Sequence, residues 1–258
     1  MVDYKTFCYF MLTPMISEVK LKKDIVHFCQ RLTQQGFVAN HDGNISVKVG
    51  SKLWATPTAQ NKGDVTEDML VSLDLNGKKL SGTYSVFSEI DLHLACYRLR
   101  SDIEVVIHAH PPIATAFAVS GVSLQKVFIA EAVVTLGEEI PLVPFIPPGC
   151  PDTEKTLSSF LPCADVFLLK NHGVLAVGKD LAQAYYRLEL VEHLAKIEWH
   201  AKSLGAPQPL PQKTIEKLLE KRKKAGLARP SKPEEMSASS SLDQIVAEEV
   251  NRFLSQNR

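Results

Sequence analysis

Closely spaced cysteine pairs are absent from this sequence of 258 residues. Its five cysteines lie far apart along the chain, at Cys8, Cys29, Cys96, Cys150 and Cys163. A disulfide framework or a cysteine-based zinc site needs cysteines at close, regular spacing, so the pattern argues against both. Cys29 and Cys96 fall in expected helices among apolar neighbours, where buried free thiols are usual. We therefore expect a reducing, cytoplasmic environment.

The sequence also lacks an excess of charge and a long apolar run. Lys and Arg together number 29, as do Asp and Glu, so no general basic field favours nucleic acid. No apolar run approaches the roughly 20 residues of a membrane-spanning helix, so we expect no membrane partner. Residues 7–15 are apolar but short and contain Pro14. We interpret them as part of an N-terminal arm, with a secretory signal as the alternative.

Two histidines stand at the end of a short apolar run, residues 105–110 (VVIHAH). Residues 105–107 predict a buried strand, which ends at Pro111 and Pro112 because proline cannot donate to a ladder. Residues i and i+2 of a strand point to the same side, so His108 and His110 present two imidazoles together. A catalytic zinc ion usually takes three protein ligands, and His172 offers a third. The alternative is a chance pair of surface or core histidines.

Apolar periodicity predicts an α/β domain. Helical spacing predicts helices at 18–35, 85–100, 113–119, 152–161 and 181–203. Alternation and turn residues predict strands at 45–49, 53–56, 70–74, 105–107, 167–169 and 174–177. Residues 126–131, 132–136 and 142–145 are short apolar segments between turn signals.

The composition changes after Leu204. Residues 205–211 form a Gly- and Pro-containing linker, 214–225 predict a short basic helix, and 228–240 have the composition of a mobile segment. Ser241 opens a last amphipathic helix. We therefore expect an N-terminal arm at 1–17, one domain at 18–204, and a linker with a helical, partly mobile tail at 205–258.

Five separated motifs occur in the order seen in the class II aldolase/adducin family. They are Gly43-Asn44-Ile45-Ser46, Thr56-Pro57-Thr58, Ser88-Glu89, His108-x-His110 and His172-Gly173. Residues 20–203 therefore resemble this family, which includes fuculose-phosphate and rhamnulose-phosphate aldolases. The resemblance implies an α/β fold with three αβα layers around a central, largely antiparallel sheet. It also implies a homotetramer.

The resemblance assigns roles to the histidines and to one glutamate. His108, His110 and His172 would bind a divalent metal, Zn2+ or another such as Mn2+. Glu89 matches the family's catalytic glutamate, and its alternative is a first-turn glutamate favoured by the helix dipole. His93 lies one helical turn after Glu89, and we interpret it as a supporting or core residue rather than a ligand.

Further positions match those that bind the substrate phosphate in the family: Gly43, Asn44, Thr58 and Ser88. Turns and helix starts supply N–H donors to such anions. The phosphate pocket nevertheless departs from the aldolases at two places. Ala59 stands where they tend to have glycine, and Phe87 stands where they tend to have the first serine of Ser-Ser-Glu.

Two charged residues are further candidates. Lys62 lies in the same loop as Thr58 and could supply a cation, with a solvated loop lysine as the alternative. The fuculose-phosphate aldolase has a tyrosine in the segment that matches residues 127–131, where this chain has none. Glu131 is a candidate acid there, and its alternative is a solvent-facing carboxylate.

The first hypothesis for function is a metal-dependent aldolase of carbohydrate metabolism. It would cleave a small ketose 1-phosphate of the fuculose-phosphate type to dihydroxyacetone phosphate and an aldehyde, through a metal-bound enediolate. One alternative is a dehydratase or decarboxylase of the same scaffold acting on a sugar phosphate or sugar acid. Another is a non-catalytic, adducin-like interaction protein.

Overall fold

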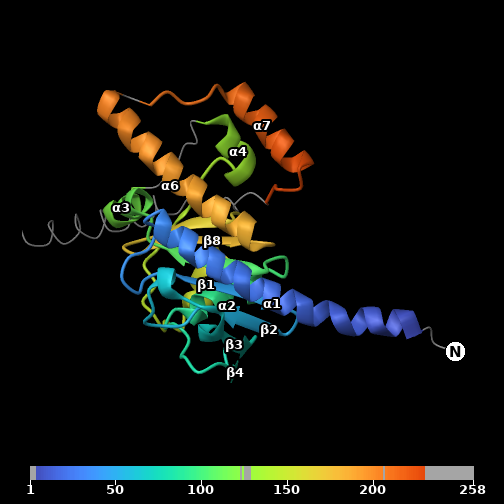
Figure 1. The fold of residues 1–258 in the computed structure, drawn as a ribbon. Helices are drawn as coiled ribbons and strands as arrows, with labels where there is room; N and C mark the ends of the chain where they lie inside the picture. The colour runs from blue at the N-terminus through green and yellow to red at the C-terminus, as the bar shows by residue number, and fades with distance from the viewer. Residues whose placement is uncertain (1–3, 123, 125–128, 206, 230–258) are drawn as a thin grey trace, which may run out of the picture.

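A computed structural model describes residues 4–122, 124, 129–205 and 207–229, with side chains from residue 18 onward. Within these residues the chain forms one eight-stranded sheet accompanied by helices (Figure 1). The helix predicted from Ser241 and the first half of the apolar segment 126–131 lie outside the described residues. None of the described helices is both long and apolar enough to span a membrane.

The sheet is largely antiparallel, as the family resemblance implies. Its strand order is β4-β3-β2-β1-β5-β8-β7-β6, and only β6 and β7 pair in parallel. The strands are β1 (Asn44–Val49), β2 (Lys52–Ala55), β3 (Val71–Asp74), β4 (Lys79–Ser81), β5 (Val105–Ala109), β6 (Leu142–Val143), β7 (Val166–Leu169) and β8 (Gly173–Gly178). The histidine strand β5 therefore lies in the middle of the sheet, between β1 and β8.

The helices follow the predicted order, with several different bounds. The α-helices are α1 (Tyr4–Gln34), α2 (Ile90–Leu99), α3 (Pro112–Ser120), α4 (Ala130–Leu136), α5 (Thr153–Ser158), α6 (Leu181–Leu204) and α7 (Gln212–Lys224), and two 3-10 turns are η1 (Lys62–Asp64) and η2 (Glu67–Met69). Helix α1 begins well before residue 18. Helix α4 forms where the sequence predicts only a short apolar segment.

Helix α2 begins at Ile90, so the predicted start at residue 85 is wrong. The backbone N–H of Thr58 donates to the carbonyl of Ser85 (2.9 Å), and Pro57 forms an isolated β-bridge with Val86. These contacts hold the segment extended beside the 57–58 loop. The N-cap residue is Glu89, whose side chain makes no capping hydrogen bond. The carboxylate of Glu89 therefore does not cap the helix and is available for other contacts.

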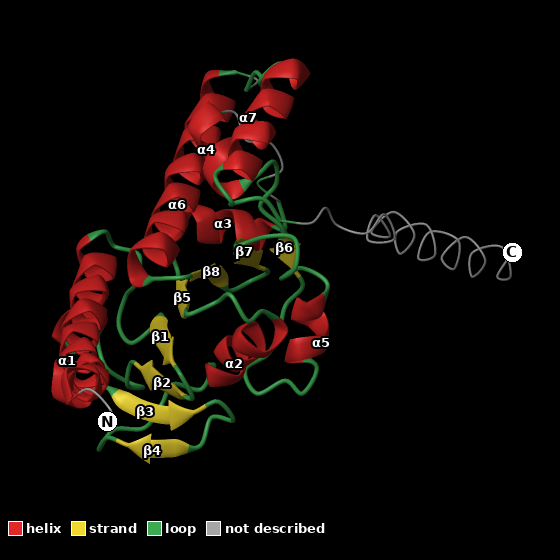
Figure 2. Ribbon diagram, turned by 90° about the vertical axis from the view of Figure 1, so that its right-hand side faces the viewer, coloured by secondary structure: helices red, strands yellow, loops and turns green. Residues whose placement is uncertain are grey.

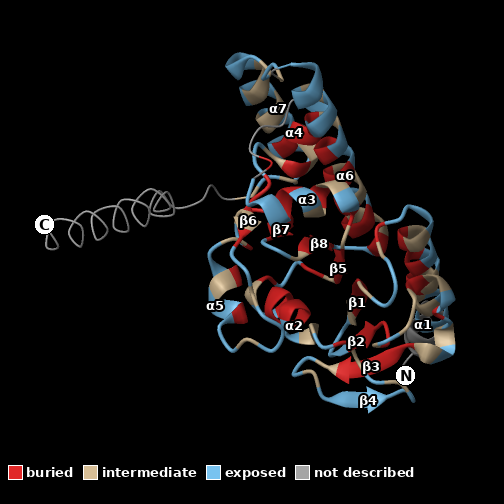
Figure 3. Cartoon of the chain, turned by 90° about the vertical axis from the view of Figure 1, so that its left-hand side faces the viewer, coloured by how far each residue is buried: buried red, intermediate tan, exposed pale blue. Residues whose placement is uncertain are grey.

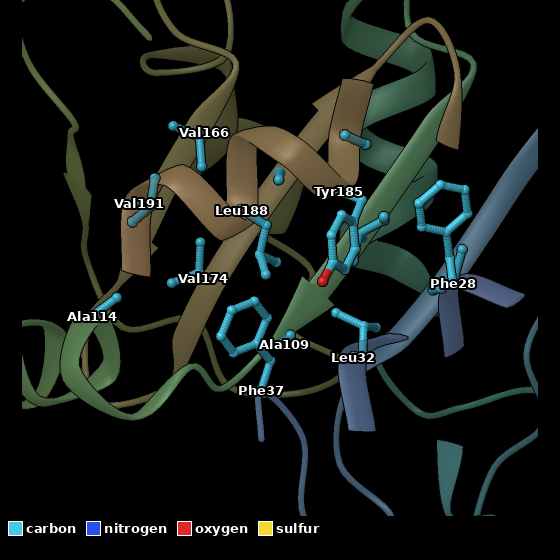
Figure 4. Packing of buried hydrophobic residues seen from close by; sticks show 14 of the residues in the cluster. Phe28, Leu32, Phe37, Ala109, Ala114, Val166, Val174, Tyr185, Leu188 and Val191 are labelled. Atoms are coloured by element: carbon cyan, nitrogen blue, oxygen red, sulfur yellow. The ribbon is translucent and has the colours of Figure 1, made fainter. Parts of the chain in front are cut away.

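Apolar side chains gather in two clusters on the two faces of the sheet, because successive strand residues point in opposite directions. In β5, Ile107 joins one cluster and Val106 the other. The first cluster receives side chains from α1, α3, α4 and α6, and Figure 4 shows Phe28 of α1 beside Tyr185 of α6. The second receives side chains from α2 and α5. Figure 3 shows that β3 is buried while the edge strand β4 is exposed.

A buried carboxylate ties α7 to the domain. Asp165, just before β7, is 1% exposed and forms ion pairs with Arg100 and Arg187 (2.8 Å each) and with Arg229 (2.8 Å). Arg222 of α7 lies 3.8 Å away. In Figure 2, α7 stands beside α4, which it contacts. The described part of the tail is thus fixed to the domain by charge as well as by apolar contacts.

Asp165→Asn should lower the free energy of unfolding by about 3–5 kcal/mol, because it leaves buried guanidinium groups without their counter-charge. Asp102→Asn is the matched control. Its side chain is 50% exposed while it pairs with Arg100 and Arg229, and its loss should cost less than about 1 kcal/mol. Urea unfolding of both variants measures the difference. Equal losses would mean that Asp165 is not the centre of this cluster.

Candidate active site

Two neighbouring strands bring three histidines together. His108 lies in β5, His110 follows the strand, and His172 lies in the turn between β7 and β8. In the pairing of β5 with β8, Ala109 lies opposite Val174. The turn that carries His172 therefore lies at the end of β5. The ligand nitrogens of the three histidines all lie within 4.8 Å of one another. His172 therefore lies beside His108 and His110, where a third ligand is expected.

The hydrogen bonds of two histidines define their protonated nitrogens. His108 Nδ1 lies 3.0 Å from the carbonyl oxygen of Val174, which can only accept, so Nδ1 carries the proton. His110 Nδ1 lies 3.0 Å from a carboxylate oxygen of Asp42 and donates to it in the same way. Both Nε2 atoms are then unprotonated, and they lie 3.0 Å apart. Two lone pairs at this distance repel unless a cation lies between them, so this donor set fits a divalent metal that accepts imidazole ligands.

Burial keeps these histidines neutral. It lowers the pKa of His108 well below its usual value. It also lowers the pKa of His110, against the opposing charge of Asp42. Because a metal ligand must be unprotonated, both residues are in the form that coordinates.

The turn that carries His172 depends on two backbone positions. Asn171 has φ 55°, in the left-handed region that asparagine tolerates better than most residues. At Gly173, an added Cβ would lie 2.5 Å from both the carbonyl oxygen of Ala109 and Cδ2 of His110. The absence of a side chain at Gly173 therefore lets β8 pack against the histidine strand.

Glu89 borders the point where the histidines converge. Its Oε1 lies 2.6 Å from His172 Nε2 and its Oε2 lies 3.7 Å from His108 Nε2. Asn44 Nδ2 donates to Oε2 (2.8 Å). Burial alone would raise the pKa of Glu89, but the contact with His172 and the hydrogen bond from the Asn44 amide hold it well below its usual range. Glu89 is therefore an ionised carboxylate.

The other predicted substrate residues lie around this centre. Gly43 has φ 69° and an added Cβ would lie 2.5 Å from Val38 Cγ1 and 3.1 Å from the carbonyl oxygen of His108. Thr58 pairs through its backbone with Ser85, which places its loop beside the segment that leads through the exposed Ser88 to Glu89. Ala59 has φ 54°, so this loop keeps a conformation that favours glycine although it carries alanine.

Phe87 and His93 lie behind the site rather than in it. Phe87 is buried in the second apolar cluster, and its ring centroid is 4.9 Å from that of His93. His93 is fully buried, and its Nδ1 lies 2.7 Å from the hydroxyl of Ser46, which also contacts the Tyr97 hydroxyl (2.7 Å). Burial lowers the pKa of His93 to about 3, against the opposing charge of Glu89. His93 is a neutral core histidine, as the sequence analysis interprets it.

Lys62 and Glu131 occupy different environments. Lys62 is 1% exposed rather than solvated, and its ammonium group donates to the carbonyls of His41 (3.2 Å) and Gln60 (2.7 Å). Glu131 is exposed in the first turn of α4. It lines a recess between α4, the end of α1 and α6, and none of the three histidines lines that recess.

Asp42 is a site residue that the sequence analysis missed. It contacts His110 although 68 residues separate them. The only local sign of this role is that Asp42 directly precedes the Gly43-Asn44 motif. Sequence spacing alone does not show that Asp42 lies beside His110.

The chain was compared with known families and proteins. A model of the Class II Aldolase and Adducin N-terminal domain matches residues 23–199. The L-fuculose phosphate aldolase of Methanocaldococcus jannaschii is 35% identical over 177 residues, which cover 68% of this chain and 94% of that protein.

Solved structures show the same fold. An L-fuculose 1-phosphate aldolase superposes with a TM-score of 0.73 at 27% identity, covering 79% of this chain and 96% of the other. YgbL of Escherichia coli, described as a putative aldolase/epimerase/decarboxylase, has a TM-score of 0.72 at 27% identity. The match covers 78% of this chain and 99% of YgbL. The likeness therefore extends over nearly the whole length of those two proteins and about four-fifths of this chain.

Gly173→Ala should weaken zinc binding strongly and lower the free energy of unfolding by about 1–3 kcal/mol, since the new methyl group collides with the end of β5 and with His110. Gly178→Ala is the matched control in the same strand. Its methyl group would lie 2.8 Å from the backbone nitrogen of Ala184, so it should reduce stability but leave zinc affinity unchanged. Chelator competition and thermal unfolding separate the two effects. Equal zinc affinities of the two variants would contradict this account.

The metal-free protein should lose stability in acid partly through His93. In the unfolded chain this side chain takes up a proton near pH 6.5, whereas in the folded protein it stays neutral down to about pH 3. The unfolded state therefore binds more protons as pH falls from about 6.5 to about 3, and the stability lost approaches 1.4 kcal/mol per pH unit. Urea unfolding between pH 7 and pH 4 should show a shallower decline in His93→Gln than in the wild type. An identical decline would show that His93 does not contribute.

Proposed function

The chain belongs to the class II aldolase and adducin family, and from that premise we propose that it is a divalent-metal-dependent aldolase acting on a small ketose 1-phosphate. The observation that carries the proposal is the convergence of three histidine ligands beside one ionised carboxylate, Glu89. The products would be dihydroxyacetone phosphate and an aldehyde. The fuculose-phosphate type of substrate rests on the names of the similar aldolases.

We assign His108, His110 and His172 as the metal ligands, with Zn2+ as the metal and Mn2+ as the alternative. Three histidines form a ligand set typical of catalytic zinc. When bound, a divalent cation supplies a Lewis acid that stabilises the negative charge left beside a ketone when the carbon–carbon bond breaks. The remaining chemistry belongs to the side chains around it.

Glu89 is the proposed proton carrier. Cleavage removes a proton from the hydroxyl group of the carbon that becomes the aldehyde, and the bonding electron pair stays on the ketone fragment as an enediolate. That fragment then needs one proton on carbon to become dihydroxyacetone phosphate. An ionised carboxylate can take up one proton and return it, so no net proton is consumed. Asn44, which donates to Glu89, would keep this carboxylate oriented.

The substrate phosphate is proposed to bind at Gly43, Thr58 and Ser88, with Asn44 as a further contact. The loop that carries Thr58 pairs with residues 85 and 86, which lead to Ser88, and this supports a shared anion site for Thr58 and Ser88. Lys62 donates to backbone carbonyls, and we therefore give it a supporting role in the loop. Glu131 lies apart from the histidines within one chain, so it could act only on another subunit of the expected homotetramer.

The wider organisation remains as the sequence analysis states it. We propose an arm at 1–17, a catalytic domain at 18–204 and a tail at 205–258. The two apolar clusters, one on each face of the sheet, support a three-layer αβα arrangement.

A decarboxylase or dehydratase of the same scaffold is the second candidate. YgbL, whose description includes decarboxylase, matches this chain almost as well as the fuculose 1-phosphate aldolase does. Phe87 favours this candidate as well, since the buried ring replaces a serine of the aldolase pattern. A purely adducin-like interaction protein would not need Glu89 beside three histidines.

Glu89→Gln should retain the metal and reduce cleavage by about 10²- to 10⁴-fold, because it removes a proton-transfer group. Zinc-loaded protein would be given ketose 1-phosphates, including fuculose 1-phosphate and deoxy and methylthio pentuloses. Release of dihydroxyacetone phosphate would be followed with a coupled reductase. Glu154→Gln, an exposed carboxylate in α5, is the matched control and should retain full activity.

The outcome separates the candidate reactions. Release of dihydroxyacetone phosphate that disappears in Glu89→Gln would support the aldolase. A metal-loaded protein that releases none, but releases carbon dioxide from a keto sugar acid phosphate, would contradict it and support the decarboxylase.

A further inference from the structure

His110 is held on two sides by one turn. Its backbone N–H donates to the carbonyl of Phe37 (2.8 Å), and its Nδ1 donates to Asp42 Oδ2 (3.0 Å). Both partners belong to the connection between α1 and β1. Neither comes from the strand that carries the histidine.

The two histidines of the β5 end are oriented in different ways. His108 Nδ1 donates to the carbonyl of Val174, a group that the β5–β8 ladder fixes whatever side chains are present. His110 lies beyond the paired part of β5 and has no such ladder partner for its ring. Its Nδ1 depends on the side chain of Asp42. Of the two histidines at the end of β5, His110 is therefore the one whose ring orientation a single substitution can remove.

Asp42 is itself held in place. Its Oδ1 accepts from the backbone N–H of Ala39 (2.5 Å), and its own N–H donates to the carbonyl of Ala39 (3.0 Å). The next contact comes from Lys62, which is buried and donates to the carbonyl of His41. Lys62 thus joins the 60–62 loop to the residue that precedes Asp42. The turn is fixed from both of its ends.

We propose that Asp42 is a positioning residue of the metal centre, which keeps His110 Nδ1 protonated and aims its Nε2 at the shared ligand position. The proposal rests on the metal centre of the proposed function. A carboxylate that accepts from the outer nitrogen fixes the ring and makes the coordinating nitrogen a better electron donor. Loss of such a partner typically costs 10- to 100-fold in metal affinity. Asp42 contacts no expected substrate atom and acts only through His110.

Asp42→Asn is the decisive variant. Its amide oxygen can still accept from the N–H of Ala39, while its NH2 group then faces the N–H of His110, so the turn is kept and the contact with the ring is lost. Zinc affinity would be measured by chelator competition on the full chain, together with the absorption spectrum of the Co2+ form and the melting temperature of the metal-free protein. Asp42→Ala is the second variant. Asp64→Asn, the same change at an exposed aspartate of η1, is the control.

We expect zinc affinity to fall by about 10- to 100-fold in Asp42→Asn and in Asp42→Ala, with an altered Co2+ spectrum. Asp64→Asn should match the wild type, and the metal-free melting temperature of Asp42→Asn should stay close to it. Unchanged zinc affinity in both Asp42 variants would overturn the proposal. So would a loss of affinity with an unaltered Co2+ spectrum and a lowered melting temperature, since the turn would then act only on folding.

The same experiment keeps the two proposals apart. A wild-type protein that binds zinc but cleaves no ketose phosphate removes the proposed reaction and leaves the role of Asp42 standing on its affinity data. A wild-type protein that binds neither Zn2+ nor Co2+ overturns both.

Discussion

The hydrogen-bonded pairing of β5 with β1 on one side and β8 on the other is the constraint on which the site depends. It sets His108 opposite Asn44 in one neighbour and Leu175 in the other. A shift of one residue in either pairing would turn these side chains to the opposite face of the sheet. Buried apolar clusters on both faces resist such a shift, because it would also move core side chains out of their contacts.

Within this frame, electrostatics decides the state of each group. Burial favours neutral imidazoles at His108 and His110, while the contacts with His172 and the Asn44 amide favour the ionised form of Glu89. The site therefore combines neutral imidazoles at His108 and His110 with one ionised carboxylate. The Nδ1 atom of His108 donates to a backbone carbonyl, and the Nδ1 atom of His110 donates to a carboxylate. Their unprotonated Nε2 atoms therefore face each other.

Sequence patterns predicted the parts of this arrangement that depend on neighbouring residues. Strand periodicity places His108 and His110 on one side, and the following prolines mark the end of the strand. The same local argument was wrong at α2, where apolar spacing extends to residue 85 but the extended pairing with the 57–58 loop delays the helix to Ile90. A long-range contact there outweighs helical propensity. As a result Glu89 occupies the N-cap position with its carboxylate turned to the histidines.

The sequence by itself determined the strands β1, β2, β3, β5, β7 and β8, the order of the motifs and the residue types that suit a metal. Those features depend on periodicity and on side-chain chemistry, which a linear chain displays. The tertiary structure decided that Lys62 is buried, that Phe87 packs behind the site and that Asp42 holds His110. Such contacts join residues that are far apart in the chain. They form because packing of the whole domain brings these segments together. No local sequence pattern indicates which distant residues will meet.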